Sequence, residues 1–190
     1  MCKMVQWTRT VLLVALTVAL SARNAAAVEA VIDEFSASTN SGVLTLTFSV
    51  KNCFNQKMEE AIKAGVPTTF NFRVKVYKKR PIGLMNKVAN HRFTHTLVYD
   101  NIQKDYRVML EEAAKELRAE TLEEAKALMA RVENFGVIER HLLTEGRYRI
   151  AVKAELDPVR LPLRMEFVLF FVSLWDFETD WYDHDFRVTP

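Results

Sequence analysis

Three segments of this sequence alternate between apolar and polar residues, and this alternation limits the folds open to the chain. In VLTLTFSV (43–50), leucines, Phe48 and Val50 occupy one set of alternate positions, while threonines and Ser49 occupy the other. The segments FNFRVKVY (70–77) and YRIAVKAEL (148–156) show the same period. A period of two is typical of strands with one buried and one solvated face, as in many antiparallel sheets. The pattern therefore predicts an antiparallel sheet or sandwich.

Weaker signals add further strands. The segment VEAVIDEF (28–35) and the turn sequence TNSG (39–42) predict a hairpin with the strand at 43–50. Short strands are also expected at 93–99 and 106–110. A sheet of this size gives the chain enough apolar surface for one core.

Two helices are expected between the strands. The first spans 56–64, with Asn55 as its N-cap and Gly65 just beyond its end. The second is expected from Thr121, where Glu124 has capping-box spacing, to Gly136. Its apolar stripe consists of Leu122, Ala125, Leu128, Met129 and Val132. Whether the charged, helix-prone segment 111–120 joins this helix is left open. The expected fold class is α+β: one domain, dominated by an antiparallel sheet or sandwich, with two packed helices.

The C-terminal stretch FVLFFVSLWDFETDWYDHDF (167–186) begins apolar and becomes acidic and aromatic. Its apolar part, 167–175, is far shorter than the roughly 20 residues that cross a bilayer as a helix. Apolar residues at both alternate positions favour a strand covered on each side, although a helical register also fits. From Trp175 the alternation is strict, with Phe177, Thr179 and Trp181 expected on one face. Its phase changes between Trp181 and Tyr182, which predicts a turn, a bulge or a change of strand partner.

Residues 1–27 have the pattern of a signal peptide. Lys3 and Arg9 precede an apolar run at 11–20, and Ala25 and Ala27 supply the small residues that a signal peptidase recognises. Cleavage after Ala27 would leave 28–190 as a single exported, periplasmic domain. An uncleaved N-terminal anchor is the alternative, and it is the one membrane attachment that the sequence predicts.

The charge balance argues against a nucleic-acid partner. The segment 1–27 contains three basic residues and no acid, so the remaining chain has 23 basic against 24 acidic residues. Nucleic-acid binding usually needs a basic surface, which a near-neutral chain does not predict. The basic run KKR (78–80) is interpreted as a solvated strand end.

Candidate catalytic groups are few. Cys53 is the one cysteine after residue 27, so it has no internal disulfide partner, and its apolar neighbourhood predicts a buried thiol. No GxSxG motif is present, and Ser173 lies inside the apolar run. His91 and His95 would share a strand face at a spacing of about 13 Å, too far apart for one metal ion. The sequence thus predicts no catalytic residue, no metal ligand and no cofactor.

The acidic residues near the C-terminus are the candidates for a metal site. They are Asp176, Glu178, Asp180, Asp183 and Asp185, with His184 among them. Acids at alternate strand positions point one way, about 7 Å apart, whereas Ca²⁺ needs oxygens that converge. A solvated charged face is therefore expected. The aromatic residues of the same region, Phe170, Trp175, Trp181 and Tyr182, are either core or contacts to a ligand or partner, and they are the candidate site residues.

Four segments resemble a known family. They are EEAIKAGVPTTFNFRVKVYKKR (59–80), YDNIQKDYRV (99–108), YRIAVKAELDPVRLPL (148–163) and DWYDHDFRV (180–188). In this order they are similar to an exported bacterial family, domain of unknown function 4390, although FVLFFVSLW (167–175) is more apolar than the usual family counterpart. The resemblance implies a secreted domain of a Gram-negative-type envelope and brings no catalytic residues. Relatives are often encoded near a membrane sensor kinase, which implies an inner-membrane or periplasmic protein partner.

The expected function is therefore that of a non-enzymatic periplasmic interaction or accessory module. A binder of an apolar small molecule or lipid is the alternative, and it requires a pocket lined by aromatic residues. An envelope hydrolase is the third hypothesis, which lacks a recognisable nucleophile and base.

Overall fold

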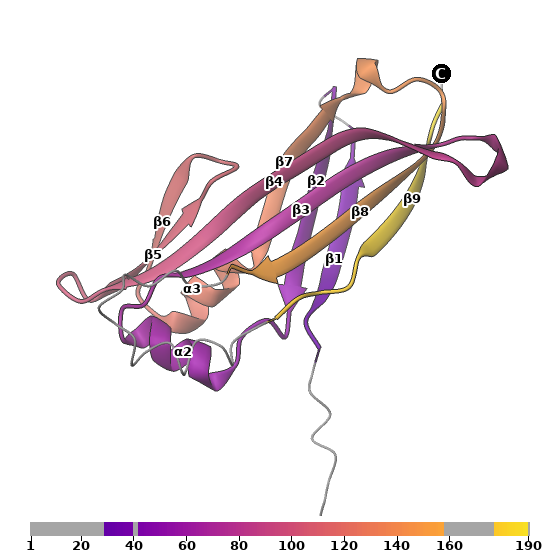
Figure 1. Ribbon diagram of the computed structural model, residues 1–190. Helices are drawn as coiled ribbons and strands as arrows, with labels where there is room; N and C mark the ends of the chain where they lie inside the picture. Colours follow the sequence, from indigo (N-terminus) through magenta and orange to yellow (C-terminus); the bar gives the residue numbers. More distant parts are fainter. Residues whose placement is uncertain (1–28, 40–41, 158–176, 190) are drawn as a thin grey trace, which may run out of the picture.

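The computed structural model describes residues 29–39, 42–157 and 177–189, which form two antiparallel sheets and two α-helices (Figure 1). The strands are β1 (Val31–Ser38), β2 (Val43–Lys51), β3 (Thr68–Lys79), β4 (Met85–Asp100), β5 (Asp105–Leu110), β6 (Lys115–Ala119), β7 (Arg131–Glu139), β8 (Gly146–Leu156) and β9 (Tyr182–Val188). The helices are α2 (Gln56–Lys63) and α3 (Leu122–Met129), and two 3₁₀ turns are η1 (Pro81–Gly83) and η2 (Arg140–Leu142). The α+β fold class is confirmed.

The strands with the clearest alternation form the framework of the sheets. One sheet has six strands in the order β6-β5-β4-β3-β8-β9, and the other has the order β1-β2-β7. The segments 70–77 and 148–156 lie side by side as β3 and β8, with Phe72 opposite Ala154. Strands β1 and β2 pair antiparallel, so the expected hairpin pairing is confirmed.

The two sheets pack face to face around one core. Phe48 of β2 and Phe72 of β3 meet edge to face, with ring centroids 6.0 Å apart. Phe72 also stacks on Phe93 of β4 at 5.2 Å, and all three rings are buried. Full burial of one such side chain contributes roughly 1.5–3 kcal/mol, so apolar contact between the sheets holds the layers together.

Both helices begin where their capping residues predict. The amide N–H of Met58 donates to Asn55 Oδ1 at 2.9 Å, and α2 buries Met58, Ala61 and Ile62. The amide N–H of Glu124 donates to Thr121 Oγ1 at 3.2 Å and fixes the start of α3. Helix α3 packs against β4, β5 and β6 of the six-stranded sheet.

The expected end of the second helix was wrong. Helix α3 stops at Met129, and Val132 and Gly136 belong to β7, opposite Phe48 and Thr45 of β2. A bulge in β7, where Asn134 has φ 50°, changes the phase of the strand, so the buried Val132 and Val137 are an odd number of residues apart. Because of this phase change, the sequence of β7 does not show the alternation of a regular strand. The charged segment 111–120, for which the sequence did not decide between joining the helix and standing apart, is separate from α3. It forms a turn followed by β6.

The change of phase near the C-terminus is confirmed. Residues 177–181 form no regular strand, apart from a bridge between Glu178 and Glu155, and β9 begins at Tyr182. Thr179 is buried as expected, but Trp181, which was predicted to share its face, is 38 % exposed. The apolar run 167–175, with the choice between strand and helix, lies outside the described residues. Within the described part of the chain, no helix has the length and apolar character needed to cross a membrane.

Candidate functional site

Trp181 and Tyr182 lie where the irregular segment 177–181 becomes strand β9. Thr179 fixes this segment to β8 by two hydrogen bonds with Ala154. The amide N–H of Thr179 donates to the Ala154 carbonyl at 2.9 Å, and the amide N–H of Ala154 donates to Thr179 Oγ1 at 3.0 Å. Because Thr179 is fully enclosed, the chain reaches Trp181 from a fixed point.

The indole ring of Trp181 lies beside two lysines of neighbouring strands. The Nζ atom of Lys75 is 4.2 Å from the ring centroid, and that of Lys153 is 5.8 Å away. An exposed cation–π contact stabilises by about 0.5–1 kcal/mol. Lys153 also pairs with Glu178, so the position of this cation is itself restrained. Contacts from two strands thus hold Trp181 at the surface.

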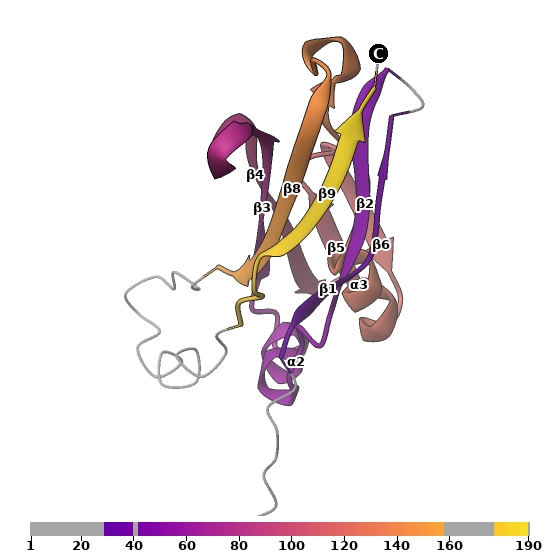
Figure 2. The same ribbon diagram turned by 90° about the vertical axis from the view of Figure 1, so that its right-hand side faces the viewer.

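Tyr182 points to the other sheet and helps to close one side of the sandwich. Its ring centroid is 5.0 Å from that of Phe35 in β1, and the ring of His184 is equally close to Phe35. Strands β1 and β9 are both edge strands, and Figure 2 shows them along the same side of the molecule. The two sheet edges therefore meet next to Trp181.

An open hollow of about 300 Å³ lies at this junction. It is lined by Glu29, Ala30, Val31, Ile32, Asp180, Trp181 and Tyr182, and is called the Trp181 hollow below. The structure thus brings together two of the four candidate residues. Phe170 and Trp175, the other two, lie outside the described residues.

The acids of β9 form ion pairs with basic residues of β3 and β8. Arg149 contacts Asp185 and Asp183, each at 2.8 Å, and Lys79 also pairs with Asp185. The hydrogen bond from Arg149, with a second from Lys79, holds the pKa of Asp185 well below its usual value. This agrees with a solvated charged face. No cluster of three or more potential metal ligands occurs among the described residues.

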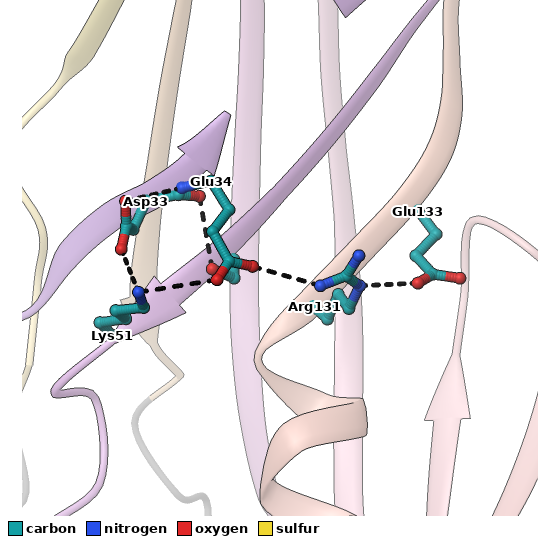
Figure 3. A network of polar contacts seen from close by, with 6 residues as sticks. Asp33, Glu34, Lys51, Arg131 and Glu133 are labelled. Atoms are coloured by element: carbon teal, nitrogen blue, oxygen red, sulfur yellow. Dashed lines mark hydrogen bonds and ion pairs between the residues drawn. The ribbon is translucent and has the colours of Figure 1, made fainter. Parts of the chain in front are cut away.

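A second charged network crosses the outer face of the smaller sheet (Figure 3). Lys51 of β2 pairs with Asp33 and lies 3.6 Å from Glu34 of β1, while Arg131 of β7 contacts Glu34 at 3.2 Å and Glu133 at 2.6 Å. A bulge in β1 turns Glu34 into this position with φ 51°. All five side chains are about half exposed, and each faces an opposite charge. The network therefore aligns three strands and does not form a ligand site.

The two central histidines have separate partners. His91 Nε2 is 2.7 Å from the Val137 carbonyl. His95 is fully buried, with Nδ1 2.8 Å from the Met129 carbonyl and Nε2 3.1 Å from Glu112 Oε2. Sequence reasoning missed the partner Glu112, because it lies in a charged turn far from His95 along the chain. The pair ties that turn to the core.

Cys53 is buried, as expected. Its thiol donates to the Val50 carbonyl at 3.3 Å, and burial raises its pKa to about 12. A thiol nucleophile reacts as the thiolate, so this group is poorly suited to catalysis at neutral pH.

The comparisons with known proteins identify the family. A family model described as domain of unknown function, DUF4390, matches residues 27–185. No curated protein and no solved structure matches the chain. The family match extends over all of the described strands except the end of β9 and includes the Trp181 hollow, so this chain belongs to the DUF4390 family.

Proposed function

We propose that this protein is a non-enzymatic periplasmic module that binds another envelope protein through the Trp181 hollow. The observation that carries this proposal is Trp181 itself, a large aromatic side chain that is 38 % exposed and held by neighbouring cations. Tryptophan is enriched among residues that dominate protein–protein binding, especially where a fixed ring enters a pocket of the partner.

The surroundings of Trp181 favour a protein over an apolar small molecule or lipid. A hollow of about 300 Å³ is at the lower end of ligand pockets, which usually enclose most of the ligand. Its lining includes the exposed acids Glu29 and Asp180, which an acyl chain would have to desolvate. A protein surface can instead pair those acids at the rim and cover the indole ring at the centre.

The state of the candidate catalytic groups favours binding over hydrolysis. The thiol of Cys53 is buried with a raised pKa, and His91 and His95 contact carbonyl groups inside the fold. The signal-peptide pattern at 1–27 supports export, and the partner we propose is an inner-membrane or periplasmic protein, for example in a sensor kinase complex.

Site-specific photo-cross-linking in the native host tests this proposal. A photoreactive amino acid would replace Trp181, with exposed Lys115 on β6 as the control position. We expect a discrete protein adduct at 181 and none at 115. The identified partner, once purified, should then bind the Trp181→Ala variant at least roughly 30-fold more weakly, the effect of losing a central aromatic contact.

Two results would overturn the proposal: no adduct at 181, or equal affinity of the partner for wild type and Trp181→Ala. Native mass spectrometry of protein from the periplasm supplies the second readout. A constant small-molecule mass that is lost in Trp181→Ala would establish the ligand-binding alternative instead. The same spectrum measures whether cleavage occurs after Ala27.

A further inference from the structure

The hairpin between β3 and β4 projects beyond the core and exposes apolar side chains at its tip. Residues 80–88 are all exposed. Ile82 is 98 %, Leu84 65 % and Met85 49 % exposed, and these three residues are called the hairpin tip. The loop is closed by a hydrogen bond from the Arg80 N–H to the Leu84 carbonyl at 2.8 Å. Figure 1 shows this hairpin extending past the sheets.

The backbone at the hairpin tip makes its apolar character unexpected. Ile82 has φ 67°, in the left-handed region that suits glycine or asparagine and costs a residue with a Cβ roughly 1–2 kcal/mol. A β-branched residue is especially rare there. Ile82 therefore adds neither packing nor a favourable turn conformation to the folded chain. Exposed apolar groups that the fold does not need often mark a binding surface.

Basic side chains surround the hairpin tip. Residues 77–88 include Lys78, Lys79, Arg80 and Lys87 and no acid, and Arg147 lies nearby on β8. Lys79 is paired with Asp185. Arg80, Lys87 and Arg147 have no carboxylate partner in the part of the chain that the structure describes, and these three are called the basic collar.

The base of the hairpin is hollow. An open space of about 390 Å³ is lined by Lys79, Arg80, Pro81, Ile82, Gly83, Leu84, Met85, Arg147 and Arg149. Guanidinium groups bind phosphate oxygens through two parallel hydrogen bonds. The hollow therefore places phosphate-binding groups directly beside apolar ones, an arrangement that matches the headgroup and upper acyl chain of a phospholipid.

We propose that this hairpin binds the surface of a membrane that contains anionic phospholipids. The hairpin tip enters the interface between headgroups and acyl chains, and the basic collar contacts headgroup phosphates. Interfacial binding of this kind combines buried apolar area with attraction between cations and anionic lipid. The chain after residue 27 carries one more acid than base, so attraction to the membrane depends on this local patch.

The hairpin is a different membrane contact from an uncleaved N-terminal anchor. The start of β1 and the hairpin tip lie toward opposite ends of the sandwich in both views (Figures 1 and 2). The Trp181 hollow is lined by none of the hairpin residues, so the membrane contact is independent of the proposed protein partner.

Sedimentation with lipid vesicles tests the proposal. The protein would be residues 28–190, which contain every described element, and the vesicles would be phosphatidylcholine with or without phosphatidylglycerol. We expect binding only with phosphatidylglycerol, weakened by added salt. Replacing both Arg80 and Lys87 with Gln should lower the partition coefficient roughly 30-fold, at about fivefold for each cation near an anionic surface.

A matched set of variants separates membrane binding from stability. Ile82→Asn should abolish most vesicle binding while leaving the melting temperature unchanged or higher, because Asn tolerates positive φ. Ile102→Ser, at an apolar position that is 92 % exposed in another turn, should leave binding unchanged, as should Lys104→Gln with Lys115→Gln. Trp181→Ala should also bind vesicles like wild type.

Three results would overturn the proposal. The first is no binding to vesicles that contain phosphatidylglycerol. The second is binding that survives both Ile82→Asn and the Arg80 and Lys87 double variant. The third is equal binding to phosphatidylcholine alone, which would remove the role of the basic collar. A protein cross-link that forms at the hairpin tip, with vesicle binding absent, would assign the hairpin to a protein partner instead.

Discussion

Replacing Glu112 with alanine should destabilise the protein because it removes a partner of a fully buried histidine. Both groups next to the His95 ring are acceptors: the Met129 carbonyl at 2.8 Å from Nδ1 and Glu112 Oε2 at 3.1 Å from Nε2. The Nδ1 atom must therefore donate to the Met129 carbonyl, and Nε2 and Glu112 Oε2 make the second hydrogen bond of the ring. The Glu112 side chain is itself only 7 % exposed, so water cannot easily take its place.

The size of the effect follows from the burial of the pair. Leaving one buried polar atom without a hydrogen bond costs about 1–3 kcal/mol, and removing one partner of a buried ion pair costs about 3–5 kcal/mol. A loss of about 3 kcal/mol is a large share of the roughly 5–15 kcal/mol that stabilises a domain. It corresponds to a fall in Tm of about 6–12 °C for a protein of this size.

Urea unfolding followed by circular dichroism measures this loss, with two control variants. Glu112→Gln keeps a side chain that can hydrogen-bond to Nε2, so its loss should be less than half that of Glu112→Ala. Glu116→Ala removes an exposed acid from β6 and should change the free energy of unfolding by less than about 0.5 kcal/mol. If Glu112→Ala were as stable as Glu116→Ala, or Glu112→Gln as unstable as Glu112→Ala, the proposed hydrogen-bond role of Glu112 would be wrong.

Three further predictions concern single groups. Cys53, whose pKa burial raises to about 12, should react with a thiol reagent at neutral pH only after denaturant unfolds the chain, and a fast reaction in the native protein would contradict its burial. Asp185→Asn should lower stability at neutral pH. The lowered pKa of Asp185 stabilises the folded state fully above the ordinary aspartate pKa near 4, and this stabilisation is lost progressively as pH falls from there through the pKa of the folded state. The difference from wild type should therefore shrink below about pH 4. A gap that stays constant down to strongly acidic pH would refute this linkage. Gly65→Ala should cost about 1 kcal/mol in urea unfolding because Gly65 has φ +83° at the end of α2, whereas Gly136→Ala, with ordinary contacts around its Cβ, should cost much less.

The strands that the sequence predicted most clearly are those without a bulge, in which buried and partly exposed residues alternate along the strand. In β3 and β8, every second residue enters the core without interruption, so apolar positions such as Val74 and Val152 repeat with a period of two. The bulged strands behave differently. In β7 the extra residue at Asn134 changes the phase, and Val132 follows Met129 and Leu128 by three and four residues, a spacing that also fits the apolar stripe of a helix. Which pattern applies is decided by the edge of β2, because its backbone groups need a partner strand there.

The candidate site could be predicted only in part, for a related reason. The phase change between Trp181 and Tyr182 is visible in the sequence, and it separates an exposed tryptophan from a tyrosine that packs on Phe35. Phe35 belongs to the other sheet, so its contact with Tyr182 depends on how the edges of the two sheets meet. No local sequence pattern encodes that arrangement.

The exposure of the apolar residues at the hairpin tip is also a property that local sequence patterns do not predict. The sequence predicts that the basic run KKR (78–80) is a solvated strand end, because three basic residues at the end of an alternating strand are usually no more than that. The apolar residues that follow this run acquire a different meaning because β3 and β4 pair as far as Lys79 and Met85, beyond the packed core. An apolar side chain at a strand end is ordinary when a core lies beneath it. Ile82 has no core beneath it and has an unfavourable backbone angle, so its contribution must be sought in contacts outside the folded chain.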